Sequence, residues 1–336
     1  MTDAQAPSCI VSIIVPMRNE EEYLTDFLAS LMATTYPIDK VKVIILDGMS
    51  NDHSAQIIRE FQQAQPDLNI TVLANQKVTI PSALNLGINS AESDVILRMD
   101  CHAEYDVDYV SNSVKHLFLQ PDAVGVGGVI TPVGKTDTGK AITLALSSRL
   151  GTGGASYRHT QEVVESETIW CGCWRKEDAV RAGLFNEAQE ANEDFAFNQR
   201  LQRFGKLYTC PDVMAKQYVR ESYSGLFAQY MRYGFWKAVA VKINPNDLKL
   251  RQMAPLVFFG SVLVSICFLA VSAVPFTVLT GGYLSAVLLA PIGATRGNLR
   301  LSLKVSMALV TMHGAWFLGF IKGLFKPLSA ALIKTQ

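Results

Sequence analysis

A carboxylate and an imidazole stand two residues apart, as Asp100 and His102, after the short apolar run 95–99. The run has the length of a buried strand, and ligands of parallel sheets gather beyond the carboxyl ends of such strands. Residues i and i+2 of an extended chain project from the same face, so these side chains can hold one cation. A carboxylate oxygen with an imidazole nitrogen favours Mn²⁺ over Mg²⁺. The simpler alternative is a turn that these side chains cap.

Two adjacent acids, Glu193 and Asp194, open a predicted helix farther along the chain. Neighbouring helical residues point about 100° apart, so the two carboxylates are poorly placed to flank one bond, as hydrolases require. A single carboxylate can instead accept a proton from an attacking hydroxyl. The alternative is a solvated helix N-terminus, where acidic side chains are electrostatically favoured.

Strand and helix patterns alternate over the first hundred residues. The predicted strands are 11–15, 41–46, 70–73 and 95–99, and the predicted helices between them are 19–34, 54–65 and 82–89. We expect Pro16 to stop the first strand and Asn19 to cap the helix that follows. The alternation predicts an α/β fold with a mostly parallel, doubly wound sheet.

Polar side chains follow the first two predicted strands. They suit a uracil-type base and a ribose, and they are Arg18, Asn19, Glu20, Asp47 and Ser50. Neither GxGxxG nor GxxxxGK[ST] occurs at these turns, which disfavours an NAD-dependent oxidoreductase and a P-loop nucleotidase. Helix capping is the structural alternative for Asn19, Ser50 and Asp52.

The charges are divided unevenly, although 30 basic and 30 acidic residues balance over the chain. Residues 254–336 contain no Asp or Glu, so the preceding part carries a modest negative excess, which argues against nucleic acid as a partner. The basic residues of this acid-free segment are Arg296, Arg300, Lys304, Lys322, Lys326 and Lys334. Such a segment indicates a lipid bilayer as a partner.

Two uncharged runs of spanning length, 255–274 and 276–295, predict a helical hairpin in the membrane. A third candidate, 305–321, is shorter, and Gly319 and Gly323 have the small-xxx-small spacing that lets helices approach closely. Basic residues flank the hairpin at both ends, which predicts that the preceding domain faces the cytoplasm at the inner membrane. The basic residues after 321 prefer the same side, which conflicts with a third crossing.

Seven segments, taken in order, resemble those of the inverting family 2 glycosyltransferases with a GT-A fold. They are most similar to the succinoglycan ExoA-type exopolysaccharide glucosyltransferases. The segments are VSIIVPMRNEE from 11, DGMSND from 47, TIPSALNLGI from 79, RMDCHA from 98, GLFNE from 183, NED from 192 and QYMRYGFW from 229. Each motif is weak alone, but their order over about residues 10–240 is specific. The resemblance implies a nucleotide-diphospho-sugar transferase fold followed by membrane helices.

The resemblance also implies roles for individual residues. The donor nucleotide-sugar would bind Pro16, Arg18, Asn19, Glu20, Asp47, Ser50, Lys77 and Asp100. Asp100 and His102 would hold a divalent metal, Mn²⁺ or Mg²⁺, with His102 acting directly or through water. Asp194 would be the catalytic base beside Glu193. The acceptor and pyrophosphate would meet Gly172, Gln229, Arg232, Tyr233 and Trp236.

The chain departs from the family pattern at three places. His102 stands where the family more often has a second Asp, although the ExoA-like branch also tends to have His there. Phe195 and its neighbours supply no acid after Asp194. Tyr233 replaces the Trp of the QxxRW motif, which weakens the case for processive synthesis.

From the resemblance we predict a catalytic domain over 1–220, amphipathic interface helices over 221–253, two to three transmembrane helices over 254–325 and a basic tail over 326–336. Within the glycine-rich stretch 125–174, Arg149, Arg158 and His159 could meet phosphates, or the stretch could be a surface loop.

The expected activity is transfer of a hexose, with glucose as the expected sugar, from a UDP-sugar to a polyprenyl-diphosphate-linked saccharide in exopolysaccharide or related surface-polysaccharide synthesis. Other polysaccharide-assembly proteins are expected partners. Transfer to bare polyprenyl phosphate is one alternative, and a catalytically silent nucleotide-binding membrane subunit is another.

Overall fold

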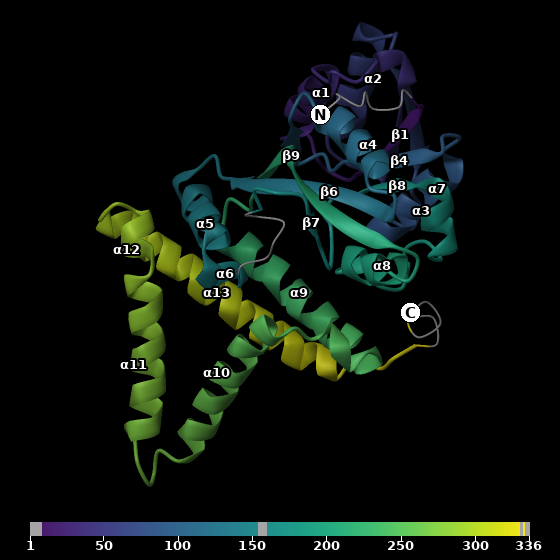
Figure 1. Cartoon of the computed structure of the whole chain (residues 1–336). Helices are drawn as coiled ribbons and strands as arrows, with labels where there is room; N and C mark the ends of the chain where they lie inside the picture. Colours follow the sequence, from purple (N-terminus) through teal and green to yellow (C-terminus); the bar gives the residue numbers. More distant parts are fainter. Residues whose placement is uncertain (1–8, 154–159, 330–331, 333–336) are drawn as a thin grey trace. The chain divides into compact units, whose positions relative to one another are not determined.

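The computed structural model describes the chain except for residues 1–8, 154–159, 330–331 and 333–336, and the chain divides into two compact units (Figure 1). The first, here called the sheet unit, is built mainly from Met1–Thr131 and Ser156–Gln217. The second, the helical unit, comprises Pro132–Ala155 and Tyr218–Ile333. Arg158 and His159, which we considered as phosphate contacts, lie outside the described residues, as does most of the predicted basic tail.

Four parallel strands form the first half of the sheet, in the order β3-β2-β1-β4. They are β1 (Val11–Met17), β2 (Val41–Asp47), β3 (Asn69–Ala74) and β4 (Val95–Arg98). The elements between them are α1 (Leu24–Met32), η1 (Ile38–Lys40), α2 (Ser54–Ala64) and α3 (Ile80–Ser90). The predicted alternation of strands and helices is therefore confirmed.

The strands after β4 pair antiparallel, so the whole nine-stranded sheet is mixed, in the order β3-β2-β1-β4-β8-β6-β9-β5 with β7 beside β9. These strands are β5 (Ala103–Tyr105), β6 (Ala123–Val133), β7 (Val164–Glu165), β8 (Cys173–Arg175) and β9 (Lys206–Tyr218). The helices of this part are α4 (Tyr109–Leu119), α7 (Lys176–Arg181) and α8 (Glu193–Leu201). The predicted α/β class is confirmed.

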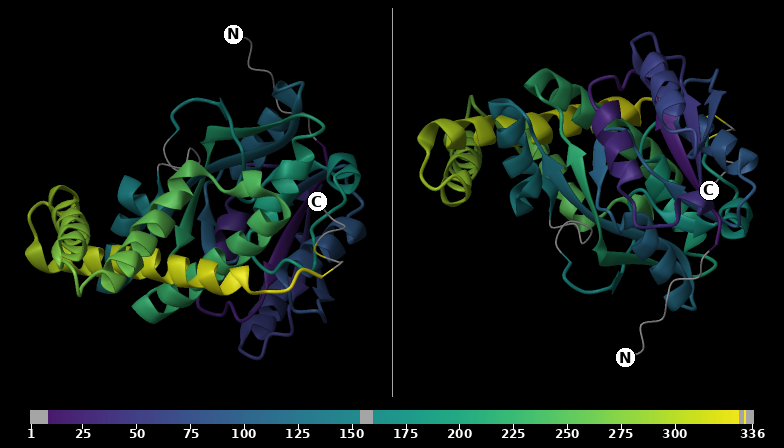
Figure 2. Two further views of the ribbon diagram at one scale, coloured as in Figure 1. Left: turned by 90° about the horizontal axis from the view of Figure 1, so that it is seen from below. Right: turned by 90° about the horizontal axis from the view of Figure 1, so that it is seen from above.

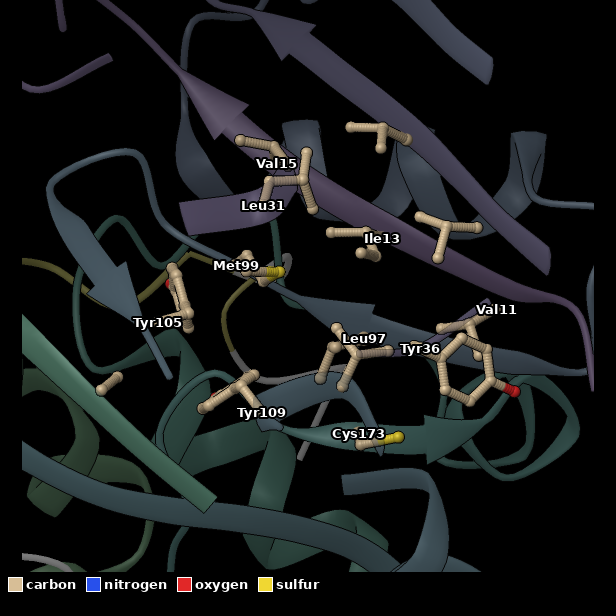
Figure 3. Packing of buried hydrophobic residues seen from close by; sticks show 14 of the residues in the cluster. Val11, Ile13, Val15, Leu31, Tyr36, Leu97, Met99, Tyr105, Tyr109 and Cys173 are labelled. Carbon is tan, nitrogen blue, oxygen red and sulfur yellow. The ribbon is translucent and has the colours of Figure 1, made fainter. Parts of the chain in front are cut away.

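The core lies on both faces of β1 because successive strand residues point to opposite sides. Val11, Ile13 and Val15 pack on one face with Leu97 and Tyr109, as Figure 3 shows. On the other face, Ile14 belongs to a second cluster with Ile44, Leu46 and Ile96. Burial on two faces explains why these strands are continuous hydrophobic runs in the sequence.

Two local predictions at the end of β1 are wrong. The strand continues through Pro16 to Met17, in register with Leu46 and Asp47 of β2. Proline is tolerated there because β4 pairs only with 11–14, so the strand beyond Ile14 has one neighbour, as an edge strand does. The following helix begins at Leu24, and Asn19 instead adopts a left-handed conformation with φ 54° in the connecting turn.

The helical unit contains the remaining helices. They are α5 (Asp137–Ser147), α6 (Arg149–Thr152), α9 (Tyr223–Ile243), η3 (Pro245–Asp247), α10 (Leu250–Cys267), α11 (Val274–Leu289), α12 (Pro291–Ala294) and α13 (Leu299–Leu324). Within this unit α9 and α13 pack side by side and run in the same direction (Figure 1). Figure 2 looks nearly along α11 and shows it beside the first turns of α13. Val274–Ala294 and Leu299–Leu324 are long and apolar enough to cross a membrane.

Glycines set the spacing between α9 and α13. A Cβ added at Gly319 would collide with the carbonyl oxygen of Met231, and one at Gly323 with that of Phe235. Gly234 of α9 faces the carbonyl oxygen of Trp316 in the same way. The close approach predicted from the Gly319 and Gly323 spacing is confirmed, and it joins α13 to α9 rather than to another apolar helix.

Replacing Gly319 with alanine should therefore destabilise the helical unit. The added methyl group meets backbone, which cannot rotate away, so we expect a loss of roughly 1–3 kcal/mol in the free energy of unfolding. Gly314 of the same helix is the matched control because a Cβ there meets nothing within 4 Å. Thermal unfolding of the purified protein in detergent should show a lower Tm for Gly319→Ala and no decrease for Gly314→Ala. Equal Tm values would contradict this packing.

Candidate active site

The end of β4 holds Asp100 in a fixed, buried position. The backbone N–H of Asp100 donates to the hydroxyl oxygen of Tyr105 at 2.6 Å, and that hydroxyl lies 3.3 Å from the Asp100 carbonyl oxygen. Tyr105 is itself part of the core on this face of the sheet (Figure 3). The carboxylate at the strand end is therefore anchored by the core and is not a mobile surface group.

Arg98 joins Asp100 to the beginning of α8. Its Nε and Nη2 atoms lie 2.8 and 3.3 Å from the two carboxylate oxygens of Asp100, and Nη1 lies 3.6 Å from Oε1 of Glu193. Arg98, Asp100 and Glu193 are 7, 6 and 7% exposed. Two sequence motifs nearly a hundred residues apart thus meet on one buried guanidinium. We did not predict this role for Arg98, which stands at the end of an apolar strand.

These contacts move the pKa values of both acids, in opposite directions. Burial works to raise the pKa of Asp100, but the charges of Arg98 and His102 outweigh it and the pKa lies below its usual value. Burial, followed by repulsion from Asp194, raises the pKa of Glu193 to about 7 despite the opposing effect of Arg98. Asp100 is therefore the more readily ionised of these two acids.

The first turn of α8 presents Asp194 differently from Glu193. Asn192, the residue before the helix, has φ 56°, and α8 begins at Glu193 as predicted. Asp194 is only half-buried, and its Oδ1 accepts a hydrogen bond from the backbone N–H of Phe195 at 2.7 Å. Of the two adjacent acids, Asp194 is the one that an external hydroxyl group can reach.

The predicted nucleotide-binding residues after β1 and β2 are brought together. Both the backbone N–H and the hydroxyl of Ser50 donate to Oδ1 of Asp47, at 2.9 and 2.7 Å, and the backbone N–H of Asn19 donates to Ser50 at 3.0 Å. The backbone N–H of Asn51 donates to the Asn19 side chain at 2.9 Å. Within the described part of the chain, Oδ2 of Asp47 accepts no hydrogen bond. This cluster orders the turn and leaves an acceptor for a ligand.

Glu20 links this turn to the strand end that carries His102. Its backbone N–H donates to Ser54 at 2.9 Å, and its Oε1 lies 3.2 Å from Nδ1 of His102. Arg18 is exposed beside it and Pro16 is half-buried. The residues predicted to contact the donor from the first strand end and from β4 therefore lie together.

Lys77, a predicted donor contact, forms an ion pair within the protein. Its Nζ lies 2.6 Å from Oε2 of Glu187, and Oε1 of the same carboxylate accepts from Asn85 at 3.1 Å. The Asn85 amide also clamps the backbone of Phe185, with bonds of 2.9 and 2.8 Å. Asn85 and Glu187 belong to the quoted segments, but the sequence did not show that these contacts tie α3 and the loop before it to the loop after α7.

The predicted acceptor residues fall in both units. Gly172 lies in the sheet unit, where its carbonyl oxygen accepts from the backbone N–H of Arg98 at 3.0 Å. Gln229, Arg232, Tyr233 and Trp236 lie on α9 of the helical unit. Within that helix, Nε2 of Gln229 donates to the Tyr233 hydroxyl oxygen at 3.0 Å, and Trp236 is buried. Their role at the acceptor remains a prediction.

A divalent cation fits Asp100 and His102 only with help from a ligand. Arg98 uses one lone pair on each oxygen of Asp100, which leaves further lone pairs on that carboxylate. No group of three or more His, Cys, Asp or Glu side chains that could hold a metal occurs among the described residues. The roles of Asp100 and His102 as metal ligands therefore remain a prediction.

Comparisons with known proteins show which family the chain resembles. The sequence profile described as Glycosyl transferase family 2 matches residues 12–180. One relative is the dolichyl N-acetyl-alpha-D-glucosaminyl phosphate 3-beta-D-2,3-diacetamido-2,3-dideoxy-beta-D-glucuronosyltransferase of Methanococcus voltae. The chain is 29% identical to it over 328 residues, and the aligned region covers 94% of this chain and 97% of that protein. It is 28% identical over 327 residues to the succinoglycan biosynthesis protein ExoA of Rhizobium meliloti, with 95% and 96% covered.

A solved structure shares the fold. The mannosyltransferase PcManGT from Pyrobaculum calidifontis, in complex with GDP-Man and Mn²⁺, superimposes with a TM-score of 0.59 at 19% identity. The match covers 94% of this chain and 87% of that one. At this level of identity the likeness establishes the fold alone, which is a GT-A fold.

The raised pKa of Glu193 predicts how stability depends on pH. The Glu193 carboxyl group has a pKa near 7 in the folded chain and an ordinary value of 4.5, so it holds its proton to higher pH in the folded state. The free energy of unfolding therefore falls as the pH rises between these values. The glutamine of Glu193→Gln cannot ionise. The free energy of unfolding of this variant should therefore rise relative to that of the wild type by up to about 1.4 kcal/mol per pH unit in that window. Unfolding measured at several pH values from 5 to 8 checks this. A difference in unfolding free energy between Glu193→Gln and the wild type that stays constant or shrinks as the pH rises would contradict the raised pKa.

Proposed function

The chain belongs to glycosyl transferase family 2, and we propose that it transfers a hexose from a UDP-sugar to a polyprenyl-diphosphate-linked saccharide, with inversion at the anomeric carbon. Glucose is the proposed sugar, and synthesis of exopolysaccharide or a related surface polysaccharide is the proposed role. The observation that carries the proposal is the meeting of Asp100 and the Glu193–Asp194 pair on the buried guanidinium of Arg98. This arrangement supports a site in which Asp100 acts on the donor side and Asp194 is the candidate base.

The donor half of the proposed site consists of the clustered strand ends. Oδ2 of Asp47 is available to accept a base N–H or a ribose hydroxyl, and the ordered turn around Asn19 and Ser50 shapes the contact surface. Asp100 and His102 would hold Mn²⁺ or Mg²⁺, whose chemistry is neutralisation of charge on the leaving diphosphate. The PcManGT structure, which contains Mn²⁺ and a nucleotide-sugar on the same fold, supports this choice of ligand.

Asp194 is the proposed base. It accepts the proton of the acceptor hydroxyl while the acceptor oxygen bonds to the anomeric carbon and the bond to the diphosphate oxygen breaks. Glu193 is unsuited to this step because it is buried against Arg98 and its pKa is raised to about 7. The acidic pair therefore offers one accessible carboxylate, Asp194, as base and none as nucleophile, which favours a single displacement that inverts the configuration.

A lipid-linked acceptor is supported by the relatives and by the helical unit. The name of the Methanococcus voltae relative describes transfer to a dolichyl phosphate-linked sugar, and ExoA is named for succinoglycan biosynthesis. A substrate confined to a bilayer surface is met at a higher effective concentration by an enzyme attached to the same surface. Gln229 and Arg232 on α9 are the proposed acceptor contacts, and the cytoplasmic face of the inner membrane is the proposed location.

Replacing Asp194 tests the mechanism. Asp194→Asn keeps the shape but removes the base, so we expect UDP release from the productive UDP-sugar to fall by roughly 10²–10⁴-fold. The assay uses membranes carrying the protein, a lipid-linked saccharide acceptor, and a donor panel of UDP-glucose, UDP-galactose, UDP-GlcNAc and GDP-mannose. Asp67→Asn, an exposed acid of the sheet unit, is the matched control and should leave turnover unchanged.

Chelation and substrate choice complete this test. Turnover should stop with EDTA and return with Mn²⁺, because the diphosphate then regains its counter-charge. The mechanism would be refuted if the wild type kept full turnover in EDTA and the Asp194→Asn variant kept full turnover as well. Nucleotide binding without turnover of any donor would refute the proposed activity and favour a silent subunit, and turnover only with bare polyprenyl phosphate would refute the proposed acceptor.

A further inference from the structure

The α10–α11 hairpin of the helical unit exposes an uncharged apolar surface. Residues 252–295 contain no Asp, Glu, Lys, Arg or His. Large hydrophobic side chains are exposed along both helices, among them Val257 at 59%, Val264 at 58% and Val278 at 65%. An exposed surface of this kind is incompatible with water, and its extent over two whole helices fits lipid hydrocarbon.

The tip of the hairpin, residues 268–273, is equally apolar, and part of its backbone is paired within the turn. Val271 is 85% exposed, yet its N–H donates to the carbonyl oxygen of Phe268 at 2.9 Å. The N–H of Ser272 donates to the same oxygen at 3.0 Å, and that of Val274 donates to the Ser272 hydroxyl at 3.2 Å. The internal pairing of these N–H groups lowers the cost of placing the turn in hydrocarbon.

The tip of the hairpin lacks the anchors of a crossing segment. The 18 residues of α10 span ~27 Å, and Val274–Ala294, in which α11 runs on into α12, spans ~31 Å, against about 30 Å of hydrocarbon, so length does not distinguish a crossing hairpin from a re-entrant one. The tip carries no Trp, Tyr, Lys or Arg that would hold it at a far headgroup layer. A cavity of ≈ 460 Å³ opens between the two helices, lined by Leu256, Val264, Phe268 and Leu279, and can take a lipid chain.

Helix α13 has the length of a span, but polar contacts tie it to the rest of the helical unit. His313, in the middle of α13, bonds through Nε2 to the carbonyl oxygen of Leu150 at 2.9 Å. Near its start, the carbonyl oxygen of Lys304 accepts from the Tyr223 hydroxyl at 3.0 Å. At its end, the Lys242 ammonium donates to the carbonyl oxygens of Leu324 and Lys326, at 2.9 and 2.6 Å. These partners lie on α6 and α9, so α13 is bound at its start, in its middle and at its end.

The surface of α13 has the pattern of a helix lying in a membrane surface. Its exposed large hydrophobic residues follow helical spacing along one stripe and include Leu303, Met307, Val310, Leu318 and Ile321. Basic residues stand at both ends of the helix, Arg300 and Lys304 at one and Lys322 and Lys326 at the other. A crossing would put one basic end on the far side, which the distribution of positive charge disfavours.

We infer that, within the described part of the chain, only the α10–α11 hairpin enters the bilayer, as a re-entrant wedge whose tip stays in hydrocarbon. The helices α9 and α13 lie along the membrane surface from which the hairpin inserts. The occupant of the apolar surface is thus the lipid of that leaflet, and the conflict between a third crossing and the basic residues after 321 disappears. The inference concerns membrane attachment and does not depend on the proposed reaction.

Cysteine labelling tests the hairpin tip. In a background with Cys9→Ser and Cys267→Ser, which removes the two native cysteines that are not buried, Ser272→Cys and Val271→Cys each place a thiol at the tip. A membrane-impermeant maleimide is added to sealed vesicles of either orientation. Labelling from each side should be no more than about a tenth of that reached after detergent. The background protein is labelled in parallel to subtract the buried cysteines.

The orientation of α13 is tested in the same vesicles. Arg300→Cys and Lys322→Cys mark its two ends, and Ser224→Cys at the start of α9 marks the surface from which the hairpin inserts. We expect all three to be labelled from the same side. Labelling of the tip from the opposite side would establish a crossing hairpin, and labelling of Arg300→Cys and Lys322→Cys from opposite sides would establish a crossing α13. Labelling of the tip from the Ser224 side without detergent would show that the hairpin is not inserted. Each result would overturn the inference.

Discussion

The pairing of one buried guanidinium with two buried carboxylates is the constraint on which the site depends. Arg98 is 7% exposed, and a charge at that depth is tolerated only when it is paired and hydrogen-bonded. Because its partners are Asp100 at the end of β4 and Glu193 at the start of α8, the pairing fixes the distance between two elements that no strand ladder joins. Asp194, one residue beyond Glu193, is thereby held near the donor side of the site.

The two units divide the work of the protein. In the sheet unit, strand ends collect Asp47, Asp100 and His102, because the carboxyl ends of parallel strands meet at one edge. In the helical unit, glycines allow α9 and α13 to pack backbone against backbone, which stiffens the helix that carries Gln229 and Arg232. Chemistry and membrane attachment are therefore built from different physical means, namely buried charge in one unit and exposed apolar surface in the other.

Much of the fold and part of the site could be predicted from the sequence. Strands buried on both faces are continuous apolar runs, and the acids at the start of α8 follow from helix electrostatics. The role of Arg98 could not be predicted, because its partner Glu193 is distant in sequence and no local pattern marks the pair. The passage of β1 through Pro16 depends on how far β4 extends. For α13, composition indicates a possible span, whereas its contacts with Leu150 and Lys242 appear only in the folded chain.

A double-mutant cycle at Arg98 and Glu193 tests the central claim most directly. Turnover of the nucleotide-sugar is measured for the wild type, Arg98→Met, Glu193→Gln and the double variant, with thermal unfolding of each to confirm folding. If the guanidinium couples the two motifs, the effects on kcat will be non-additive by more than about 1 kcal/mol, because either change alone breaks the same contact. Effects that add to within about 0.5 kcal/mol would show that Asp100 and the acidic pair act independently and would contradict the account.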